Sequence, residues 1–440
     1  MLFESVVNTS DGNFSFIAIG AKERITYKNN ETRYIDENKV QHNLETSPFE
    51  FLKSYYAKID KNKYIKKAEL AGFSFTDGFI GFIGYDMVKV FEPILKESMD
   101  SLEDNLNTPD LDLIRPKIII GFSHKNSMLT IINNENDNDE NVSKIENILK
   151  RSHLPTPLKK AELKEGKLGI DENRFKELVN ESKEHIRSGD VFQILISNRY
   201  TQHGTVDRLS FYRLLRSKNP SPYLFLLEFE DFAICGSSPE VMIKLSDGDI
   251  LLRPIAGTRK RGRDRKRDME LEAEMLNDPK ECAEHLMLID LGRNDVGRVA
   301  LTGSVKVTEM MRVERYSHVM HMVSDIEAKH SDDKDMFDLF MATFTAGTMT
   351  GAPKIKAMEL IAKFEKLKRG FYSGCIGYFA FNGNMDSAIA IRTALLQDDK
   401  VTLQAGAGVV ADSKPELEFL EVNNKLGALK ATLEELQNIQ

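Results

Sequence analysis

Short apolar or alternating runs, separated by polar turns, dominate the first third of the chain. SFIAIG, GFIGFIGYDMV, KIIIGF and SMLTII are examples, and their length and alternation are typical of β-strands. The pattern predicts a sheet-rich region over residues 1–153. Residues 133–141 are acidic and rich in amides, which predicts a solvated loop because nothing in them can bury apolar area. Pro155 and Pro157 then predict a linker over 154–170.

A helical pattern starts at Asp171, which suits an N-cap, and ends at Gly189. Its apolar face consists of Phe175, Leu178, Val179 and Ile186. VFQILISNRY then predicts a strand, FYRLLRSKN predicts a helix that ends before Pro220, and LFLLEF, FAICGSS, MIKLS and ILLRPIAG predict further strands. Helices mixed with antiparallel strands over 171–437 predict an α+β fold.

The last long motif, residues 404–425, reads QAGAGVVADSKPELEFLEVNNK. We expect Gly406 and Gly408 to form a turn whose backbone amides approach an anion, because glycine has no Cβ. Ser413 and Glu416 have the spacing of a capping box, which predicts that a helix starts there. Its buried stripe consists of Phe419, Val422, Leu426, Leu429, Leu433 and Leu436.

Glu418, Glu421 and Lys425 lie on the flank of this stripe. Two carboxylates one helical turn apart, after an anion-binding turn, suggest a site for an anionic ligand and a divalent metal. A solvated face of Glu and Lys is the alternative. A second pair of carboxylates elsewhere in the chain would decide between the two.

A second pair occurs in the segment PKECAEHLMLIDLGRND. Asp278 suits the N-cap, Pro279 the first helical position and Glu281 the third position of a capping box. Glu281 and Glu284 are again one turn apart on the predicted helix. Its packed stripe is expected to contain Cys282, Leu286 and Ile289. Two helices that each carry two carboxylates favour one shared Mg²⁺, since this ion prefers oxygen ligands; the capping role of Glu281 and a solvated acidic face remain alternatives.

Composition and charge place limits on these interpretations. The 440 residues are 41% hydrophobic and 29% charged, typical of a globular chain with one large or two medium domains. A net charge of -8 argues against general binding to nucleic acids or anionic membranes, so local basic groups must hold any anionic ligand. Cys235, Cys282 and Cys375 are far apart, which predicts free thiols. Without a signal-like N-terminus or a long apolar run, we expect a cytoplasmic protein.

Arg392 stands in the apolar run DSAIAIRTALL, which predicts a strand in which an unpaired guanidinium is costly. Because its planar fork suits a carboxylate, we expect Arg392, Tyr372 and the amides of Gly406 and Gly408 to bind a carboxylate-bearing small molecule. An internal ion pair is the alternative. For His321, in ERYSHVMHMVSDI, a hydrogen-bonded buried histidine is the simpler interpretation from the residue alone.

These motifs together resemble the chorismate-utilising enzymes, and among them most closely the anthranilate synthases. The matching blocks are LFES (2–5), GDVFQILIS (189–197), NPSPY (219–223), RPIAGTRKRG (253–262), ECAEHLMLIDLGRND (281–295), ERYSHVMH (314–321), GTMTGAPK (347–354), YSGCIGY (372–378), AGAG and the closing acidic helix. The resemblance covers nearly the whole chain. It implies a two-lobed α/β sandwich with large, mostly antiparallel sheets flanked by helices, in which 171–437 is the chorismate-binding region.

The resemblance also implies residue roles. Mg²⁺ would be surrounded by Glu281, Glu284, Glu418 and Glu421, with Glu284 and Glu421 as direct ligands. It would hold the ring carboxylate of chorismate and help the C4 hydroxyl depart. The enolpyruvyl carboxylate would be held by Tyr372, Arg392, Gly406 and Gly408, and the pocket lined by Gly257, Thr258, Thr348 and Lys425. The implied catalytic residues are His321, Glu281 and Thr348, with His321 assisting the loss of pyruvate.

The implied reaction adds ammonia to chorismate with loss of water, then eliminates pyruvate to give anthranilate. Sister activities are alternatives: aminodeoxychorismate synthases typically have a nucleophilic Lys where this chain has Ala256. Isochorismate and salicylate synthases use a Lys base at the position aligned with Gln193, and an amide cannot act as that base. Both residues favour anthranilate. A non-catalytic amino-acid sensor is a further alternative.

The resemblance implies two partners besides chorismate. No cysteine has the context of a glutamine amidotransferase nucleophile, so a separate small subunit would supply ammonia in a hetero-oligomer. Tryptophan would inhibit by feedback at a site formed by the LFES and NPSPY segments. The candidate residues are Glu4, Ser5, Asn219, Pro220, Ser221, Pro222 and Tyr223. NPSPY can also be a plain turn.

Overall fold

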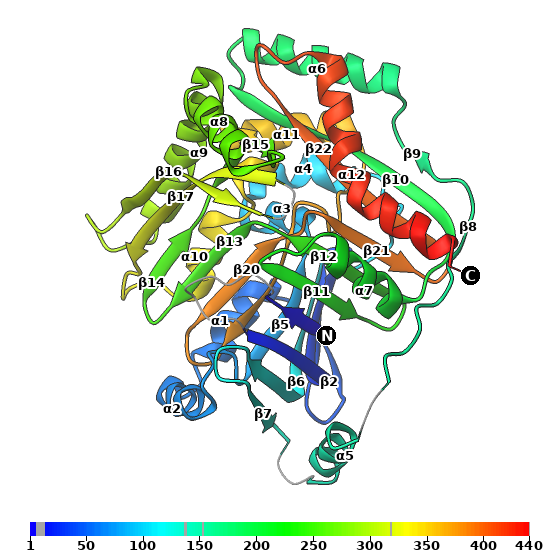
Figure 1. Ribbon diagram of the computed structural model, residues 1–440. Helices are drawn as coiled ribbons and strands as arrows, with labels where there is room; N and C mark the ends of the chain where they lie inside the picture. The colour runs from blue at the N-terminus through cyan, green and yellow to red at the C-terminus, as the bar shows by residue number, and fades with distance from the viewer. Residues whose placement is uncertain (6–13, 136–138, 152–153, 317–318, 440) are drawn as a thin grey trace.

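The computed structural model describes residues 1–5, 14–135, 139–151, 154–316 and 319–439. Every paired set of named strands in these ranges is antiparallel, and the strands form one continuous network that folds back on itself. The predicted fold class is confirmed: large antiparallel sheet layers are flanked by helices (Figure 1).

The N-terminal region is rich in sheet, as its alternating pattern predicts. Its strands are β1 (Leu2–Glu4), β2 (Phe14–Lys28), β3 (Glu31–Ile35), β4 (Gln41–Leu44), β5 (Gly78–Ile83), β6 (Leu111–Ser123) and β7 (Met128–Asn133). Its helices are α1 (Pro48–Tyr56), α2 (Lys61–Ala71), α3 (Val88–Phe91), α4 (Lys96–Asp100) and α5 (Asp139–Leu149), with the short 3₁₀ turns η1 (Tyr85–Met87) and η2 (Pro93–Leu95).

The expectation of a loop over 133–141 is wrong in part. The predicted loop at 133–141 overlaps α5, in which ion pairs Glu140–Lys144 and Glu146–Lys150 link successive turns. Residues 136–138 lie outside the described part of the chain. Within the predicted linker at 154–170, β8 (Glu162–Leu163) and β9 (Lys167–Leu168) pair with β10 (Gln193–Thr205).

The second part of the chain alternates helices and strands. Its strands are β10 (Gln193–Thr205), β11 (Tyr223–Glu228), β12 (Phe232–Ser238), β13 (Val241–Ser246), β14 (Asp249–Leu252), β15 (Ile255–Lys260), β16 (Lys306–Arg315), β17 (Val319–Lys329), β18 (Gly351–Ala352), β19 (Cys375–Ala380), β20 (Met385–Ile389), β21 (Thr393–Gln397) and β22 (Lys400–Val409). Its helices are α6 (Glu172–Arg187), α7 (Arg208–Lys218), α8 (Arg265–Leu276), α9 (Pro279–Gly297), α10 (Met336–Thr343), α11 (Lys354–Glu365), α12 (Pro415–Gln437) and the 3₁₀ turn η3 (Gly347–Met349). No described helix is long and apolar enough to cross a membrane.

Local sequence accounts for several of these boundaries. Asp171 caps α6 as predicted, since its side chain accepts a hydrogen bond from the amide of Arg174. The run ILLRPIAG, predicted as one strand, forms β14 and β15 because Pro254 has no N–H for the ladder.

Strand pairing runs through two layers. One layer follows the order β10, β22, β21, β12, β11, β1, β2, and the other follows β6, β5, β19, β20, β13, β14, β17, β16. The β2–β6 pair joins them. One core contains buried side chains of both layers with α1 and α10, and a second lies under α6, α7, α11 and α12. Because β1 pairs with β11 and β5 with β19, the sheet crosses the predicted boundary at 153.

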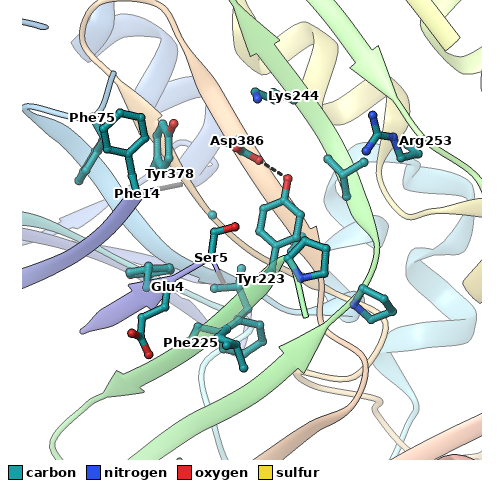
Figure 2. A pocket seen from close by; sticks show the side chains of 18 of the residues that line it. Glu4, Ser5, Phe14, Phe75, Tyr223, Phe225, Lys244, Arg253, Tyr378 and Asp386 are labelled. Carbon is teal, nitrogen blue, oxygen red and sulfur yellow. Dashed lines mark hydrogen bonds between the residues drawn. The ribbon is translucent and has the colours of Figure 1, made fainter. Parts of the chain in front are cut away.

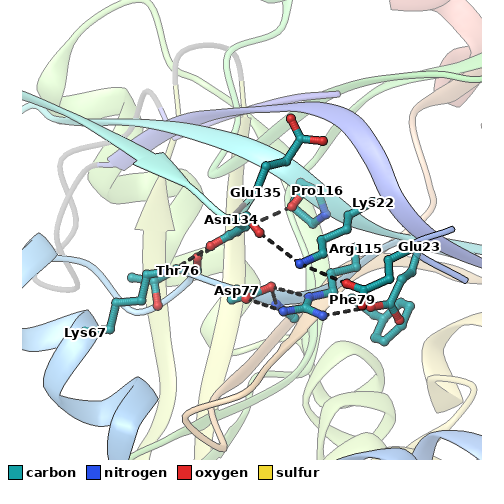
Figure 3. Close-up of polar contacts among 12 residues, drawn as sticks. Lys22, Glu23, Lys67, Thr76, Asp77, Phe79, Arg115, Pro116, Asn134 and Glu135 are labelled. Carbon is teal, nitrogen blue, oxygen red and sulfur yellow. Dashed lines mark hydrogen bonds and ion pairs between the residues drawn. The ribbon is translucent and has the colours of Figure 1, made fainter. Parts of the chain in front are cut away.

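A buried ion network fixes the N-terminal layer around Arg115 (Figure 3). Arg115 donates to both carboxylate oxygens of Asp77 at 2.8 Å and to Glu23 at 2.7 Å. Tyr34 and Tyr55 also donate to Glu23. Both carboxylates are only 3% exposed, so the fold itself neutralises this arginine and satisfies its acids.

Candidate active site

The two acidic helices start differently from each other. Asp278 caps α9 as predicted, accepting from the amides of Lys280 and Glu281. The side chain of Glu281 does not complete the box; it accepts from Arg259 at 2.7 Å. The predicted Ser413–Glu416 box is wrong, because α12 starts at Pro415, whose fixed φ and missing N–H suit the first helical position. Ser413 instead accepts from the amide of Val410.

The predicted faces of these helices are mostly confirmed. The stripe of α12 is buried from Val422 to Leu436, with Phe419 partly buried. On α9, however, Leu286 is 42% exposed, while His285 is fully buried and contacts Ser324 on β17 at 2.7 Å. The helix is therefore turned so that His285 and Leu288, rather than Leu286, face the sheet.

The four glutamates of α9 and α12 lie close enough to influence one another's charges. Burial raises the pKa of Glu284, and the charges of Glu281, Glu418 and Glu421 raise it further. Burial and Glu421 likewise raise the pKa of Glu418. Glu281 and Glu284 are partly buried, Glu418 is buried and Glu421 is exposed. Carboxylates of like charge at such close quarters favour a cation between them.

The donor set consists of carboxylate oxygens, which fits Mg²⁺. Cationic side chains contact three of the acids: Arg259 contacts Glu281, Lys280 lies 3.8 Å from Glu284, and Lys425 lies 2.6 Å from Glu421. Within the described ranges no three acidic, His or Cys side chains converge as in a closed metal site. Mg²⁺ commonly uses one or two carboxylates and completes its shell with water and substrate oxygens, so the residues fit an open site.

Arg392 does not lie within a strand as predicted. It occupies the break between β20 and β21 with φ 51°, a left-handed conformation, and is partly buried. No described carboxylate lies within ion-pair distance of its guanidinium, so the alternative of an internal ion pair is not realised. Burial lowers its pKa, while the more distant Tyr372, Glu421 and Glu240 only partly offset that effect. This cation is suited to an anionic ligand.

Gly406 and Gly408 do not form a turn; they belong to β22 and pair with Ser197 and Leu195 of β10. A Cβ at Gly406 would lie 2.6 Å from Leu195 Cδ2. Glycine is therefore required for close strand packing.

The amides of both glycines nevertheless point away from β10. Ser197 N donates to Glu365 and Leu195 N to the carbonyl of Thr350, so neither donates to its partner glycine. In antiparallel pairs of this kind both residues direct their N–H groups outward. β21 pairs with β22 only up to Leu403, which leaves the amides of Gly406 and Gly408 on an edge that β21 does not cover. Lys425 donates to the carbonyl of Gly406 at 2.9 Å.

Glu240, in the segment between β12 and β13, also belongs to this group, although it was not predicted from the sequence. It is 6% exposed and accepts a hydrogen bond from Thr348 at 2.9 Å. Burial raises its pKa to about 7, against the opposing effects of Thr348, Lys425 and Arg392. A single acid directly after the apolar run FAICGSSP was the available signal. Such a group can hold or release a proton near neutrality.

His321 lies on β17 opposite Thr258 of β15. Its Nδ1 lies 3.0 Å from Thr258 Oγ1 and 3.2 Å from the carbonyl oxygen of Gly257. Since a carbonyl only accepts, Nδ1 carries the proton and Nε2 is left as an acceptor. Burial lowers the pKa of His321, and Arg392 and Lys425 also lower it, so the ring is neutral at pH 7. His318 lies outside the described residues.

Tyr372 is 3% exposed, and burial raises its pKa. Arg392 lies close enough to influence the pKa values of Tyr372, Glu240 and His321. The structure thus gathers the predicted catalytic, metal and substrate residues around Arg392 and Lys425, and adds Glu240. Gly257 also belongs here, because a Cβ at this position would lie 3.0 Å from Glu281 Oε2.

The predicted inhibitor residues meet a separate cavity of about 480 Å³ (Figure 2). Glu4, Ser5, Pro222 and Tyr223 line it. Tyr223 donates to Asp386 at 2.9 Å, and several aromatic rings with Lys244 and Arg253 complete the wall. An aromatic wall with both an acid and bases suits an aromatic amino acid.

Not every predicted inhibitor residue reaches this cavity. Asn219, Pro220 and Ser221 do not line it, because Asn219 ends α7 and contacts Ser237. The carboxylate of Glu4 is engaged by Tyr212 and, at 2.9 Å, by Arg216. Asp386, Lys244 and Tyr378 were missed, since nothing local links them to the LFES segment.

Comparisons with known proteins identify the family of the chain. A family model described as chorismate binding enzyme matches residues 3–431. The chain is 38% identical to anthranilate synthase component 1 of Aquifex aeolicus over 436 residues, covering 96% of this chain and 86% of that protein. The Acinetobacter calcoaceticus protein of the same name is 41% identical over 451 residues, with 98% and 89% covered. The crystal structure of anthranilate synthase component I from Streptococcus pneumoniae has TM-score 0.80 at 32% identity, with 96% and 94% covered.

Proposed function

The chain belongs to the chorismate binding enzymes, and we propose that it converts chorismate and ammonia into anthranilate, pyruvate and water. The similarity to anthranilate synthases extends over most of both chains. The single observation that carries the chemistry is Arg392, a guanidinium without a carboxylate partner in the described structure. Chorismate has two carboxylates, and one of them supplies the missing anion.

Binding would place the two carboxylates at opposite ends of the site. Arg392, Tyr372 and the outward amides of Gly406 and Gly408 would hold the enolpyruvyl carboxylate. The ring carboxylate would lie towards the glutamates of α9 and α12. Glu284 and Glu421 would hold Mg²⁺ there, with Glu281 and Glu418 around it. The ion would act as a Lewis acid that favours departure of the C4 hydroxyl.

Two neighbouring groups suit the proton transfers. Glu240, with a pKa of about 7, would give a proton to the departing hydroxyl so that it leaves as water. Thr348 would orient this acid. His321, neutral and with Nε2 as an acceptor, would take the ring proton when pyruvate leaves and the ring becomes aromatic. Thr258 would fix the plane of that imidazole.

Two residues argue against the sister reactions. Ala256 on β15 cannot form a covalent bond to the substrate. Gln193 cannot remove a proton from water, and its Oε1 is buried without a hydrogen-bond partner among the described residues. The menaquinone-specific isochorismate synthase of Escherichia coli resembles this chain at only 19% identity, which shows the fold alone.

A product assay tests the proposal. Purified protein incubated with chorismate, Mg²⁺ and ammonium at alkaline pH should release fluorescent anthranilate. Finding only isochorismate, salicylate or aminodeoxychorismate would refute the proposed reaction. Tryptophan binding without any turnover of chorismate would identify an amino-acid sensor instead.

We propose that a glutamine amidotransferase subunit supplies the ammonia in a cytoplasmic hetero-oligomer. The name of the relatives, component 1, supports a second component. Cys235 and Cys375 are buried with raised pKa values, so neither is a nucleophile for glutamine. Glutamine should support turnover only when the small subunit is added, whereas ammonium should suffice without it. Turnover of glutamine by this chain alone would contradict the proposal.

Feedback inhibition by tryptophan at the separate cavity is also proposed. Tyr316 lines this cavity, and its ring lies 5.7 Å from that of His321, which gives an occupant a route to the active site. Ser5→Phe should fill part of the cavity and raise the concentration of tryptophan needed for half-inhibition. Leu70→Phe, at a 90% exposed position on α2, is the control. An unaltered inhibition curve for Ser5→Phe would exclude this site.

A further inference from the structure

Arg369 is the largest fully buried side chain of the described structure, with 1% exposure. It lies between α11 and the turn that carries Tyr372. Glu365 neutralises it through two hydrogen bonds, Nε to Oε2 at 2.8 Å and Nη2 to Oε1 at 2.6 Å. These two hydrogen bonds would be sufficient for an ion pair that only stabilises the fold.

The remaining N–H groups of Arg369 contact three other segments. Nη1 donates to the carbonyl of Met349 at 2.8 Å and to Ser373 Oγ at 3.3 Å, and Nη2 donates to the carbonyl of Leu195 at 3.0 Å. With the two bonds to Glu365, all five N–H groups of the guanidinium are used.

Each of these acceptors is next to a residue of the candidate site. Met349 follows Thr348, which orients Glu240. Leu195 pairs with Gly408, whose amide faces the site. Ser373 follows Tyr372, and the guanidinium carbon of Arg369 lies 5.7 Å from the centre of the Tyr372 ring. One side chain therefore sets the spacing of three segments that are distant in sequence.

We propose that Arg369 is a positioning residue of the active site, which fixes Tyr372, the Thr348 turn and the edge of β22 at the spacing that chorismate requires. The inference rests on the proposed function. Glu365 makes the arrangement rigid, because it also accepts from the amide and hydroxyl of Ser197. A lysine can keep the charge pair with Glu365 but cannot reach all these acceptors, since it lacks the planar fork.

The test compares Arg369→Lys with Arg115→Lys. Arg115 is a matched control: it is a partly buried arginine, 12% exposed, with a bidentate carboxylate and an aromatic neighbour, Phe381 at 4.9 Å, but its partners lie in the N-terminal network. Steady-state kinetics are measured with varied chorismate at saturating ammonium and Mg²⁺, alongside thermal unfolding. Arg369→Lys should raise KM for chorismate and lower kcat/KM by about 10- to 100-fold, as for a small misplacement of binding groups. Arg115→Lys should change both constants by less than about twofold while lowering Tm.

Equal kinetic effects of the two variants, or wild-type constants for a folded Arg369→Lys protein, would overturn the positioning role. If Arg369→Lys does not fold, Ser373→Ala decides, because it removes one contact between Arg369 and the Tyr372 turn. This variant should raise KM for chorismate about three- to tenfold, the effect of one hydrogen bond; an unchanged KM would overturn the proposal. Wild-type protein that makes no anthranilate would refute the proposed function instead, so the two failures are distinct.

Discussion

Arg115 and Arg392 are both arginines that are largely shielded from solvent. The fold neutralises the charge of Arg115 but not that of Arg392. Burial lowers the pKa of Arg115, but hydrogen bonds and charges from Asp77 and Glu23 outweigh it, and the pKa rises. Burial also lowers the pKa of Arg392, and none of the described carboxylates is close enough to reverse the effect. A buried cation that the fold neutralises contributes to stability. One that the fold leaves unpaired is suited to a ligand.

The largest expected effect concerns the acids of the open site. Glu284→Gln or Glu421→Gln should lower Mg²⁺-dependent turnover by at least about 10³-fold, because each removes a charge that would hold the ion. The fold should survive, since these acids do not neutralise a buried partner as Asp77 does. Anthranilate fluorescence against Mg²⁺ concentration measures the effect. Glu416→Gln, on the exposed face of α12, is the control. Unchanged turnover in the first two variants would show that Glu284 and Glu421 belong to a solvated acidic face and do not hold the ion.

Removing the paired arginine should affect stability. Arg115→Met leaves Asp77 and Glu23 buried without their cation, which should lower the free energy of unfolding by about 3–5 kcal/mol. Urea denaturation measures this change. The KM for chorismate of the folded variant should match that of wild type. A folded variant of unaltered stability would show that the network around Arg115 is dispensable.

Removing the unpaired arginine should impair catalysis and leave the stability of the fold unchanged. Arg392→Met should lower kcat/KM for chorismate by about 10²–10³-fold, the effect of losing one partner of a buried ion pair with the substrate. Its free energy of unfolding should not fall, because no internal partner is left unpaired. Parallel denaturation and kinetics of the two methionine variants test the contrast. A stability loss as large as that of Arg115→Met would indicate an internal partner for Arg392.

The smallest expected effect is a pH dependence at Glu240. In the folded chain its pKa rises from 4.5 to about 7, so within this window the folded state holds a proton that the unfolded state has released. Glu240 therefore lowers the free energy of unfolding as pH rises from 4.5 to 7. Glu240→Gln cannot ionise and should gain up to about 3 kcal/mol relative to wild type between pH 4.5 and 8. Urea denaturation of both proteins at the two pH values measures it, and a constant difference between them would contradict the shift.

The sequence by itself determined the local features of this protein. The cap at Asp171, the cap at Asp278 and the acid pairs on α9 and α12 depend on residues within a few positions of one another, so spacing and propensity suffice. The resemblance of ordered motifs to chorismate-utilising enzymes identified the family that the comparisons confirm.

Only the tertiary structure decided which charges find partners. Glu240 and Thr348 are 108 positions apart, and nothing near either residue indicates their contact. The glycines at 406 and 408 look like a turn in isolation, but pairing with β10 makes them a strand with outward amides. Whether Arg115 or Arg392 is neutralised depends in the same way on distant segments meeting. Local physics sets an element and its exposed face, whereas the free energy of a buried charge depends on neighbours that only folding brings within a few ångströms.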